Sequence, residues 1–168
     1  MSSNRRTRQI VLTAAALTLL FAVTAAALFC PKGAEKGFLI LEDPKSGARY
    51  AGFEMEAGDC FSVGFIHSVN KSPVTDYFEV RSDGIYGIKT VYYGFGAGVP
   101  TELEEGQILS YGEDGSMILT GMEIKMDHLI YRVGTVSDHI LTLRDGQEIS
   151  LRKLCGRSAR VAFRFEKA

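Results

Sequence analysis

Residues 60–80 read CFSVGFIHSVNKSPVTDYFEV, which is two alternating runs separated by four turn-forming residues. Alternation of apolar with small or polar residues is typical of half-buried strands. If residues 70–73 form the loop of an antiparallel hairpin, His67 lies directly opposite Asp76. Every second side chain of a strand shares one face, and the face that carries His67 is otherwise apolar. The pattern therefore predicts a histidine–carboxylate pair inside the core face of a hairpin.

The next turn predicts a third strand with a third polar residue. A three-residue loop at 82–84 puts glycine where a left-handed residue is needed and places Thr90 opposite Asp76. A two-residue loop would instead turn the charged side chain of Lys89 into the core face. We therefore expect a polar layer of His67, Asp76 and Thr90 across a three-stranded meander.

A further hairpin is expected near the C-terminus. A three-residue loop at 145–147 pairs Leu143 with Ile149 and keeps apolar side chains on one face. The same register brings His139 onto the apolar face at the start of its strand.

Short alternating runs separated by Gly, Asp, Asn and Pro turns continue through the chain, and no convincing helix follows the N-terminal segment. This pattern predicts an all-β domain, an antiparallel barrel or sandwich of short strands. The expected strands are 38–41, 49–53, 60–69, 74–81, 85–95, 107–111, 116–120, 122–126, 129–134, 140–144, 147–151 and 160–165.

The first thirty residues differ from the rest. Arg5, Arg6 and Arg8 precede an uncharged, mostly apolar stretch at 10–29, which is long enough to span a bilayer as a helix. The arginines favour an N-terminus in the cytoplasm. A retained anchor is preferred over a cleaved signal peptide, because the stretch is longer than the usual apolar region of a signal peptide. A lipoprotein at Cys30 is disfavoured by the bulky residue before it.

These features predict an anchor or signal segment at 1–30, a linker at 31–37 and an extracytoplasmic β domain at 38–166. The expected location is the cytoplasmic (inner) membrane, with a single pass, or the periplasm or exterior after cleavage. Beyond the anchor, 16 of the 19 basic residues and all 20 acidic residues remain, a net charge of −4. A mildly acidic domain with scattered basic residues is not expected to bind nucleic acid.

Two cysteines, Cys60 and Cys155, lie in the exported part of the chain. An oxidising compartment would permit a disulfide between them, and two free buried thiols are an equal alternative. No cysteine or histidine spacing indicates a structural metal.

A glycine-rich loop, FGAGVP at 95–100, follows the third strand of the meander. Its exposed backbone N–H groups could receive an anion. Glycine and proline more often mark a tight connection between strands, so the string alone is a weak signal.

Three blocks of the sequence resemble the bacterial DUF1850 family. They are FIHSVNKSPVTDYF at 65–78, Thr90 followed by FGAGVP at 95–100, and HILTL at 139–143 with Gly146. The resemblance implies no activity, because the function of that family is unknown. Its genes often lie beside those of TRAP transporters of the TAXI type, which implies an accessory role in solute uptake. Two departures occur: Asp76 stands where the family usually has Glu, and Asn70 where an acidic residue is common.

The polar layer has four possible roles: catalysis, metal binding, ligand or partner binding, and a buried structural network. Catalysis is disfavoured, because Ser68 points to the face opposite His67 and no triad geometry results. A metal site of His67, Asp76 and His139 would need His139 beside the first hairpin. A ligand or partner site at the end of the meander and a buried structural network are both favoured, and they are compatible.

The resulting hypothesis is a non-enzymatic, membrane-anchored accessory protein without a cofactor. Its expected partners are the membrane, through residues 10–29, and a TRAP permease or TAXI binding protein. A small envelope enzyme or metal-binding protein that uses His67 and Asp76 is the alternative. The expected binding residues are His67, Asp76, Thr90, Gly96, Ala97, Gly98 and Pro100.

Overall fold

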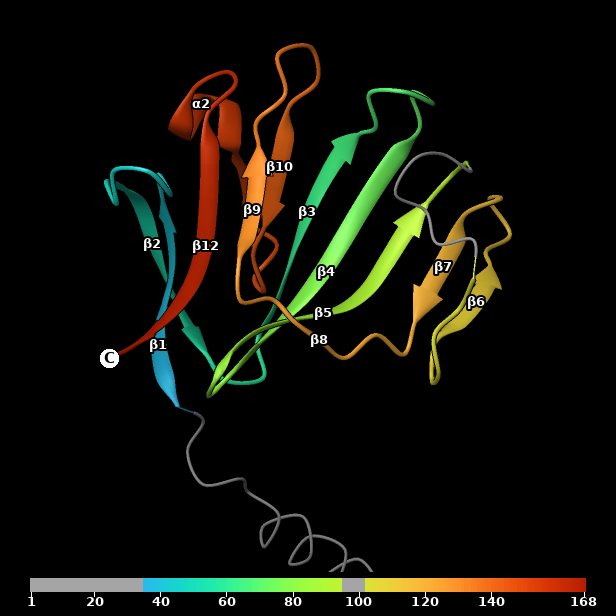
Figure 1. Ribbon diagram of the computed structural model, residues 1–168, viewed down its shortest axis with the longest axis horizontal. Helices are drawn as coiled ribbons and strands as arrows, with labels where there is room; N and C mark the ends of the chain where they lie inside the picture. Colours follow the sequence, from blue (N-terminus) through green and yellow to red (C-terminus); the bar gives the residue numbers. More distant parts are fainter. Residues whose placement is uncertain (1–34, 95–101) are drawn as a thin grey trace, which may run out of the picture. The chain divides into compact units, whose positions relative to one another are not determined.

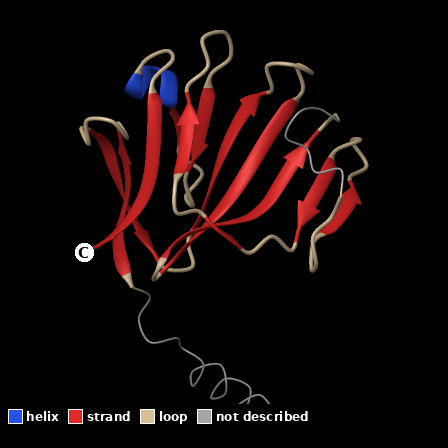
Figure 2. Cartoon of the chain, viewed as in Figure 1, coloured by secondary structure: helices blue, strands red, loops and turns tan. Residues whose placement is uncertain are grey.

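Twelve strands and one short helix make up the regular structure of residues 35–94 and 102–168, the part of the chain that the computed structural model describes (Figures 1 and 2). Within those ranges no helix is long and apolar enough to cross a membrane, and the predicted anchor at 10–29 lies outside them. The elements are β1 (Lys36–Glu42), β2 (Arg49–Glu56), β3 (Cys60–Ile66), β4 (Pro73–Arg81), β5 (Gly84–Tyr92), β6 (Ile108–Tyr111), β7 (Met117–Thr120), β8 (Ile124–Lys125), β9 (Leu129–Arg132), β10 (His139–Thr142), β11 (Glu148–Ser150), α2 (Leu151–Cys155) and β12 (Arg160–Lys167).

The strands form two antiparallel sheets, and neither of them closes. The smaller has the order β2-β1-β12-β9, and the larger has the order β11-β10-β3-β4-β5-β7-β6, with β8 pairing β5 beside β7. The all-β prediction is confirmed, whereas a closed barrel is wrong. The predicted absence of a helix is also wrong, because the end of the expected strand 147–151 turns into α2. Ser150 caps that helix by accepting a hydrogen bond from the Lys153 N–H.

The two sheets share one apolar core. Leu39 and Leu41 of β1 and Val161 of β12 come from the smaller sheet, and Val63 of β3 and Val80 of β4 come from the larger; none of the five is measurably exposed. Each lies at an alternate position of its strand, as the sequence pattern requires. Full burial of such a side chain stabilises a fold by about 1.5–3 kcal/mol before the entropy cost of ordering it.

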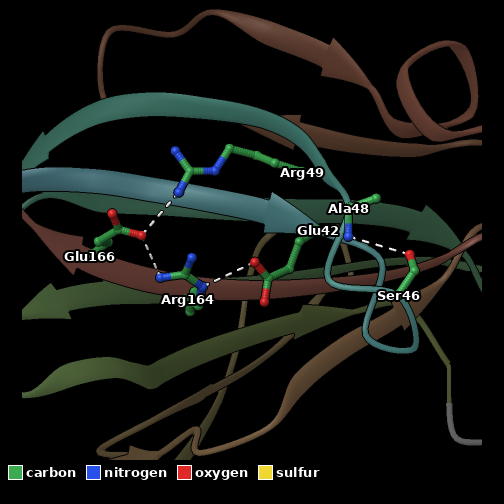
Figure 3. Close-up of polar contacts among 6 residues, drawn as sticks. All are labelled: Glu42, Ser46, Ala48, Arg49, Arg164 and Glu166. Atoms are coloured by element: carbon green, nitrogen blue, oxygen red, sulfur yellow. Dashed lines mark hydrogen bonds and ion pairs between the residues drawn. The ribbon is translucent and has the colours of Figure 1, made fainter.

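The outer face of the smaller sheet carries an ion-pair network (Figure 3). Glu166 accepts hydrogen bonds from Arg49, at 3.1 Å, and from Arg164, at 2.6 Å, and Arg164 also binds Glu42 at 3.1 Å. Ile40 points to this same outer face, yet only 1% of it is exposed. Gly52 makes room for it, since a Cβ there would lie 3.2 Å from the Ile40 Cδ1.

The Asp76–Thr90 pairing is confirmed, although the turn before it is one residue shorter than predicted. The β4–β5 turn has two residues, with Arg81 opposite Gly84, so the ladder begins one residue out of the expected register. A β-bulge then restores the register: Phe78 pairs with Gly87, and Tyr77 pairs with Lys89. The extra residue keeps Lys89 off the core face, and its ammonium lies 3.7 Å above the ring centre of Tyr77.

The predicted pairing of His67 with Asp76 is wrong. In the β3–β4 ladder Val63 lies opposite Asp76, and the pairing ends at Ile66 and Pro73. The loop therefore contains six residues, 67–72, instead of four, and His67 belongs to it. The partner of Asp76 is thus four residues from the expected one. In the C-terminal hairpin the partner of Ile149 is two residues from the expected one, Leu141 instead of Leu143. A two-residue shift leaves each side chain on its expected face.

Of the two alternatives left open for Cys60 and Cys155, the structure has the free thiols, although Cys60 is not buried. Cys60 is the first residue of β3 and is exposed, whereas Cys155 ends α2 and packs against the core. Since Ser150, just before α2, pairs with Ile140 near the other end of the β3–β10 ladder, the two thiols lie toward opposite ends of the sheet. Burial raises the pKa of the Cys155 thiol to about 11.

Candidate functional site

Asp76 and Thr90 form a polar pair in an otherwise apolar row on the inner face of the larger sheet. Its row neighbours on β3 and β10 are Val63 and Leu141, and beyond Thr90 the row continues to Leu119 of β7. The first two belong to the main core, and Leu119 belongs to a second cluster with Tyr92 and Met117. The polar pair therefore separates two apolar clusters.

Both carboxylate oxygens of Asp76 accept a hydrogen bond from a hydroxyl group. The Thr90 hydroxyl donates to Oδ1 at 2.9 Å, and the Tyr131 hydroxyl donates to Oδ2 at 2.6 Å. Both distances are in the usual range for a hydroxyl donor and an oxygen acceptor. Because Tyr131 lies in β9 and Asp76 in β4, this bond joins the two sheets.

Aromatic packing holds Tyr131 in position. Its ring meets Phe65, Phe78 and Phe163 edge-on, with centroids 5.9–6.5 Å apart. Burial, followed by the negative charge of Asp76, raises the pKa of Tyr131 far above its usual value. The phenol therefore keeps its proton and acts as a donor at any physiological pH.

His139 completes the cluster from the first position of β10, on the apolar face as predicted. It pairs with Phe65 across the ladder, stacks on that ring at 4.9 Å and meets Tyr131 edge-on at 5.8 Å. Its Nδ1 accepts a hydrogen bond from the Gly134 N–H, so in the neutral ring the proton is on Nε2. Burial lowers the pKa of His139, against the opposing effect of the Asp138 charge. No described residue pairs with Nε2.

His67 has a different role from the one predicted. Its N–H donates to the Ser72 carbonyl at 2.9 Å, its carbonyl accepts from the Lys71 N–H, and its Nδ1 accepts from the Val69 N–H at 3.3 Å. These are local bonds of the hairpin loop. Lys71 has a φ of +58°, the left-handed conformation that the loop needs.

Asn70, to which the sequence assigned only a turn, connects this loop to the end of β5. Its Nδ2 donates to the Gly94 carbonyl at 3.2 Å, and its Oδ1 accepts from the Ser72 N–H. Gly94 immediately precedes the segment 95–101. The predicted binding residues Gly96, Ala97, Gly98 and Pro100 belong to that segment and lie outside the described residues.

A second carboxylate, that of Asp138, holds the backbone at the start of β10 in place. Asp138 accepts hydrogen bonds from the backbone N–H groups of His139, at 2.7 Å, and Arg152, at 3.0 Å, and also from the Ser150 hydroxyl. These donors lower the pKa of Asp138 despite its partial burial. Asp138 therefore links β10 to the start of α2.

The arrangement does not assemble the catalytic or metal-binding sets that the sequence left open. Both Asp76 oxygens are occupied by neutral donors, and His67 lies in the loop beyond the end of the ladder instead of beside Asp76. Among the residues described, no group of three His, Cys, Asp or Glu side chains lies close enough to hold a metal ion. The geometry instead describes a hydrogen-bonded brace of Asp76, Thr90 and Tyr131.

Tyr131 is the residue that sequence reasoning missed. Its strand alternates Leu129, Tyr131 and Val133, which indicates an inward-facing ring, and a buried tyrosine hydroxyl normally has a partner. This pattern predicts that the Tyr131 hydroxyl has a buried acceptor. It does not identify Asp76 as that acceptor, because Asp76 lies in the other sheet.

No curated protein and no solved structure showed significant similarity to this sequence. A family model described as "Domain of unknown function (DUF1850)" matches residues 61–151, a little over half of the chain. The matched range includes every residue of the brace, and the chain belongs to the DUF1850 family.

Proposed function

We propose that this protein is a membrane-anchored, extracytoplasmic accessory component of a TRAP/TAXI-type solute transporter, and that it acts by binding a partner. The observation that supports a binding role is that both carboxylate oxygens of Asp76 accept a hydrogen bond, one from Thr90 and one from Tyr131. A carboxylate whose two oxygens are both engaged by structural donors is suited to holding two sheets in place and poorly suited to proton transfer.

The position of the brace in the larger sheet also supports a binding role. The Asp76–Thr90 pair lies two residues from the pair Val74–Tyr92, near the end of the larger sheet that carries the hairpin loop 67–72. Loops held by a rigid sheet are common binding elements. The location in the cytoplasmic membrane, with the N-terminus inside, rests on the apolar segment 10–29 and the arginines before it.

Co-purification tests the proposal. The full-length, C-terminally tagged protein is extracted from its native membranes in mild detergent, and the proteins that accompany it are identified by mass spectrometry. We expect a TRAP permease or a TAXI binding protein in the eluate. As a control, an unrelated single-pass protein with the same tag is extracted in parallel. An eluate without any transporter component would contradict the proposal.

A further inference from the structure

The edge of β6 differs from the other sheet edges in the part of the chain that the structure describes. β2 and β9 end the smaller sheet, and β11 and β6 end the larger one; β6 is its outermost strand at the right of Figure 1. Charged side chains on an edge strand discourage another chain from pairing with it. β2 has three charged residues, and β9 and β11 have one each. β6, with the sequence ILSY, has none.

The register of the β6–β7 ladder shows which backbone groups of β6 face away from β7. In an antiparallel pair, every second pair of opposite residues exchanges the backbone hydrogen bonds. The Gly112 N–H donates to the Ser116 carbonyl at 2.9 Å, which continues the ladder by one pair. By alternation, the N–H and C=O groups of Leu109 and Tyr111 point away from β7. Since β7 is the one described strand that pairs β6, these four groups form an open edge.

Exposed apolar side chains lie beside this open edge on both faces of the sheet. Tyr111 lies on the face that carries Met117 and is 67% exposed, and Ile108 lies on the opposite face and is 62% exposed. The side chains of an added strand would alternate between the two faces and cover both residues. The edge therefore offers backbone partners and side-chain contacts together, which are the two elements of strand addition.

Acidic residues are concentrated around β6. The sequence from 90 to 124 contains six of them and no lysine or arginine, whereas the rest of the chain from residue 31 has 16 basic and 20 − 6 = 14 acidic residues. Glu105 precedes β6, and Glu113 and Asp114 lie in the turn that follows it. Of the six, only Glu123 forms an ion pair within the described residues, with Arg81. Both ends of the open edge are therefore negatively charged.

This distribution of charge selects among the possible occupants of the edge. Two copies of β6 paired antiparallel would bring Glu105 of each chain toward Glu113 of the other, and a parallel pair would bring like residues together. Like charges opposite one another destabilise a sheet, and the stretch 90–124 has no cation to offset them. A second copy of this chain is therefore disfavoured, whereas a strand with lysine or arginine at both ends would meet opposite charges.

We infer that the open edge of β6 binds an extended segment of another protein, apolar at its centre and basic at both ends, which adds a strand to the larger sheet. The backbone of the segment pairs with Leu109 and Tyr111, and its side chains cover Ile108 and the Tyr111 ring. Its lysines or arginines lie near Glu105 and Glu113. This site is separate from the brace, and it does not require that the partner be a transporter component.

Binding of a designed peptide to the full-length protein in detergent micelles tests this site. The probe is a fluorescent peptide of alternating valine and threonine with two lysines at each end, and its anisotropy is measured against empty micelles as a blank. One matched peptide has glutamates in place of the lysines, and another has proline in place of the central valine. We expect the lysine peptide to bind at least tenfold more tightly than either. Equal affinities for the lysine and glutamate peptides would contradict the site.

Two substitutions at Tyr111 separate the backbone from the side chain. Y111P and Y111T both remove the ring, but only Y111P removes the N–H group that faces the open edge. Proline is tolerated on an edge strand where the N–H would face solvent, so the two variants should have similar melting temperatures. We expect Y111P to bind the lysine peptide at least tenfold more weakly than Y111T does. Equal binding by the two variants would show that the peptide does not pair with β6.

A pair of charge substitutions provides an independent measurement. E105Q/E113Q removes one carboxylate at each end of β6 and should weaken binding of the lysine peptide at least threefold. E54Q/E148Q is the matched control, because it changes the net charge equally at exposed positions of β2 and β11, and it should bind as the natural chain does. Equal losses in both variants would contradict a site at β6. A dimer of the natural chain that Y111P abolishes, seen by analytical ultracentrifugation, would overturn the choice of occupant.

Discussion

Two carboxylate networks stabilise this domain in opposite environments. On the outer face of the smaller sheet, Glu166 and Glu42 bind arginines in contact with water. Between the sheets, Asp76 binds the uncharged hydroxyls of Thr90 and Tyr131. The first network has formal charge pairs, but water screens them and the long side chains lose entropy when they pair. The second has no cation, but its three residues are half-buried between the sheets, where water screens a hydrogen bond less than on an open surface.

The comparison teaches that the number of charges in a network is a poor guide to its contribution to the stability of the fold. The outer network joins strands that their backbone ladders already hold together. The Tyr131–Asp76 bond joins two sheets, between which no backbone hydrogen bonds run in the described core, and it stands where one apolar cluster gives way to another. The substitutions below test this difference, from the largest expected effect to the smallest.

Removal of Asp76 should have the largest effect. D76A leaves the Thr90 and Tyr131 hydroxyls without their acceptor, and each unsatisfied group costs about 1–3 kcal/mol. We expect the free energy of unfolding to fall by about 2–4 kcal/mol in total, measured by chemical denaturation of the β domain. As a matched control, D127A removes an exposed aspartate outside the brace and should change stability by less than about 0.5 kcal/mol. Equal effects of D76A and D127A would remove the case for the brace.

His139 predicts a pH dependence with a definite sign. Its pKa is lower in the folded protein than the ordinary value of 6.5, so below that pH the unfolded chain binds more protons than the folded one. The domain should therefore lose stability as the pH falls below 6.5, with a slope of at most about 1.4 kcal/mol per pH unit from this single group.

The measurement is a series of denaturation curves between pH 7.5 and 5, on the natural chain and on H139Q. Asp138 also faces this ring, but the pKa of that carboxyl is lowered from 3.8, so its loss of stability falls at more acid pH. H139Q should reduce the slope in this window. The same slope in both chains would show that His139 is not the group responsible.

The outer network should contribute least. R164M removes the charge of Arg164 but keeps an unbranched apolar side chain opposite Ile40 in the ladder, so we expect a loss of at most about 1 kcal/mol. The difference should shrink further in 1 M NaCl, because salt screens exposed pairs. R164A also uncovers Ile40 and should cost more than R164M. A loss with R164M as large as that with D76A would reverse the comparison between the two networks.

The sequence was most informative where neighbours in space are also neighbours in the chain. Alternation predicted the strands and the meander, and the Asp76–Thr90 pairing was correct because a bulge offset the error in turn length. His67 was misplaced because the loop 67–72 can close with four residues or with six, and apolar alternation continues into Val69 in both cases. Loop length is set by contacts such as that of Asn70 with Gly94, which alternation does not encode.

Contacts between the sheets were beyond the reach of pattern analysis. Local register gives the partners of Asp76 within its own sheet, but Tyr131 is 55 residues away in the chain and belongs to the other sheet. His139 was placed on the correct face by its own hairpin. Its position beside Phe65 follows from the β3–β10 pairing, for which no short turn supplies a register.

The partner of Asp76 is the central claim, and two double-mutant cycles measured by denaturation test it most directly. One combines D76A with Y131F, and the other combines D76A with H67A. We expect the double variant D76A/Y131F to lose at least about 1 kcal/mol less than the sum of the single losses, because both single changes break the same bond. H67A should be additive with D76A to within about 0.5 kcal/mol. Coupling of Asp76 to His67 together with additivity toward Tyr131 would contradict the brace.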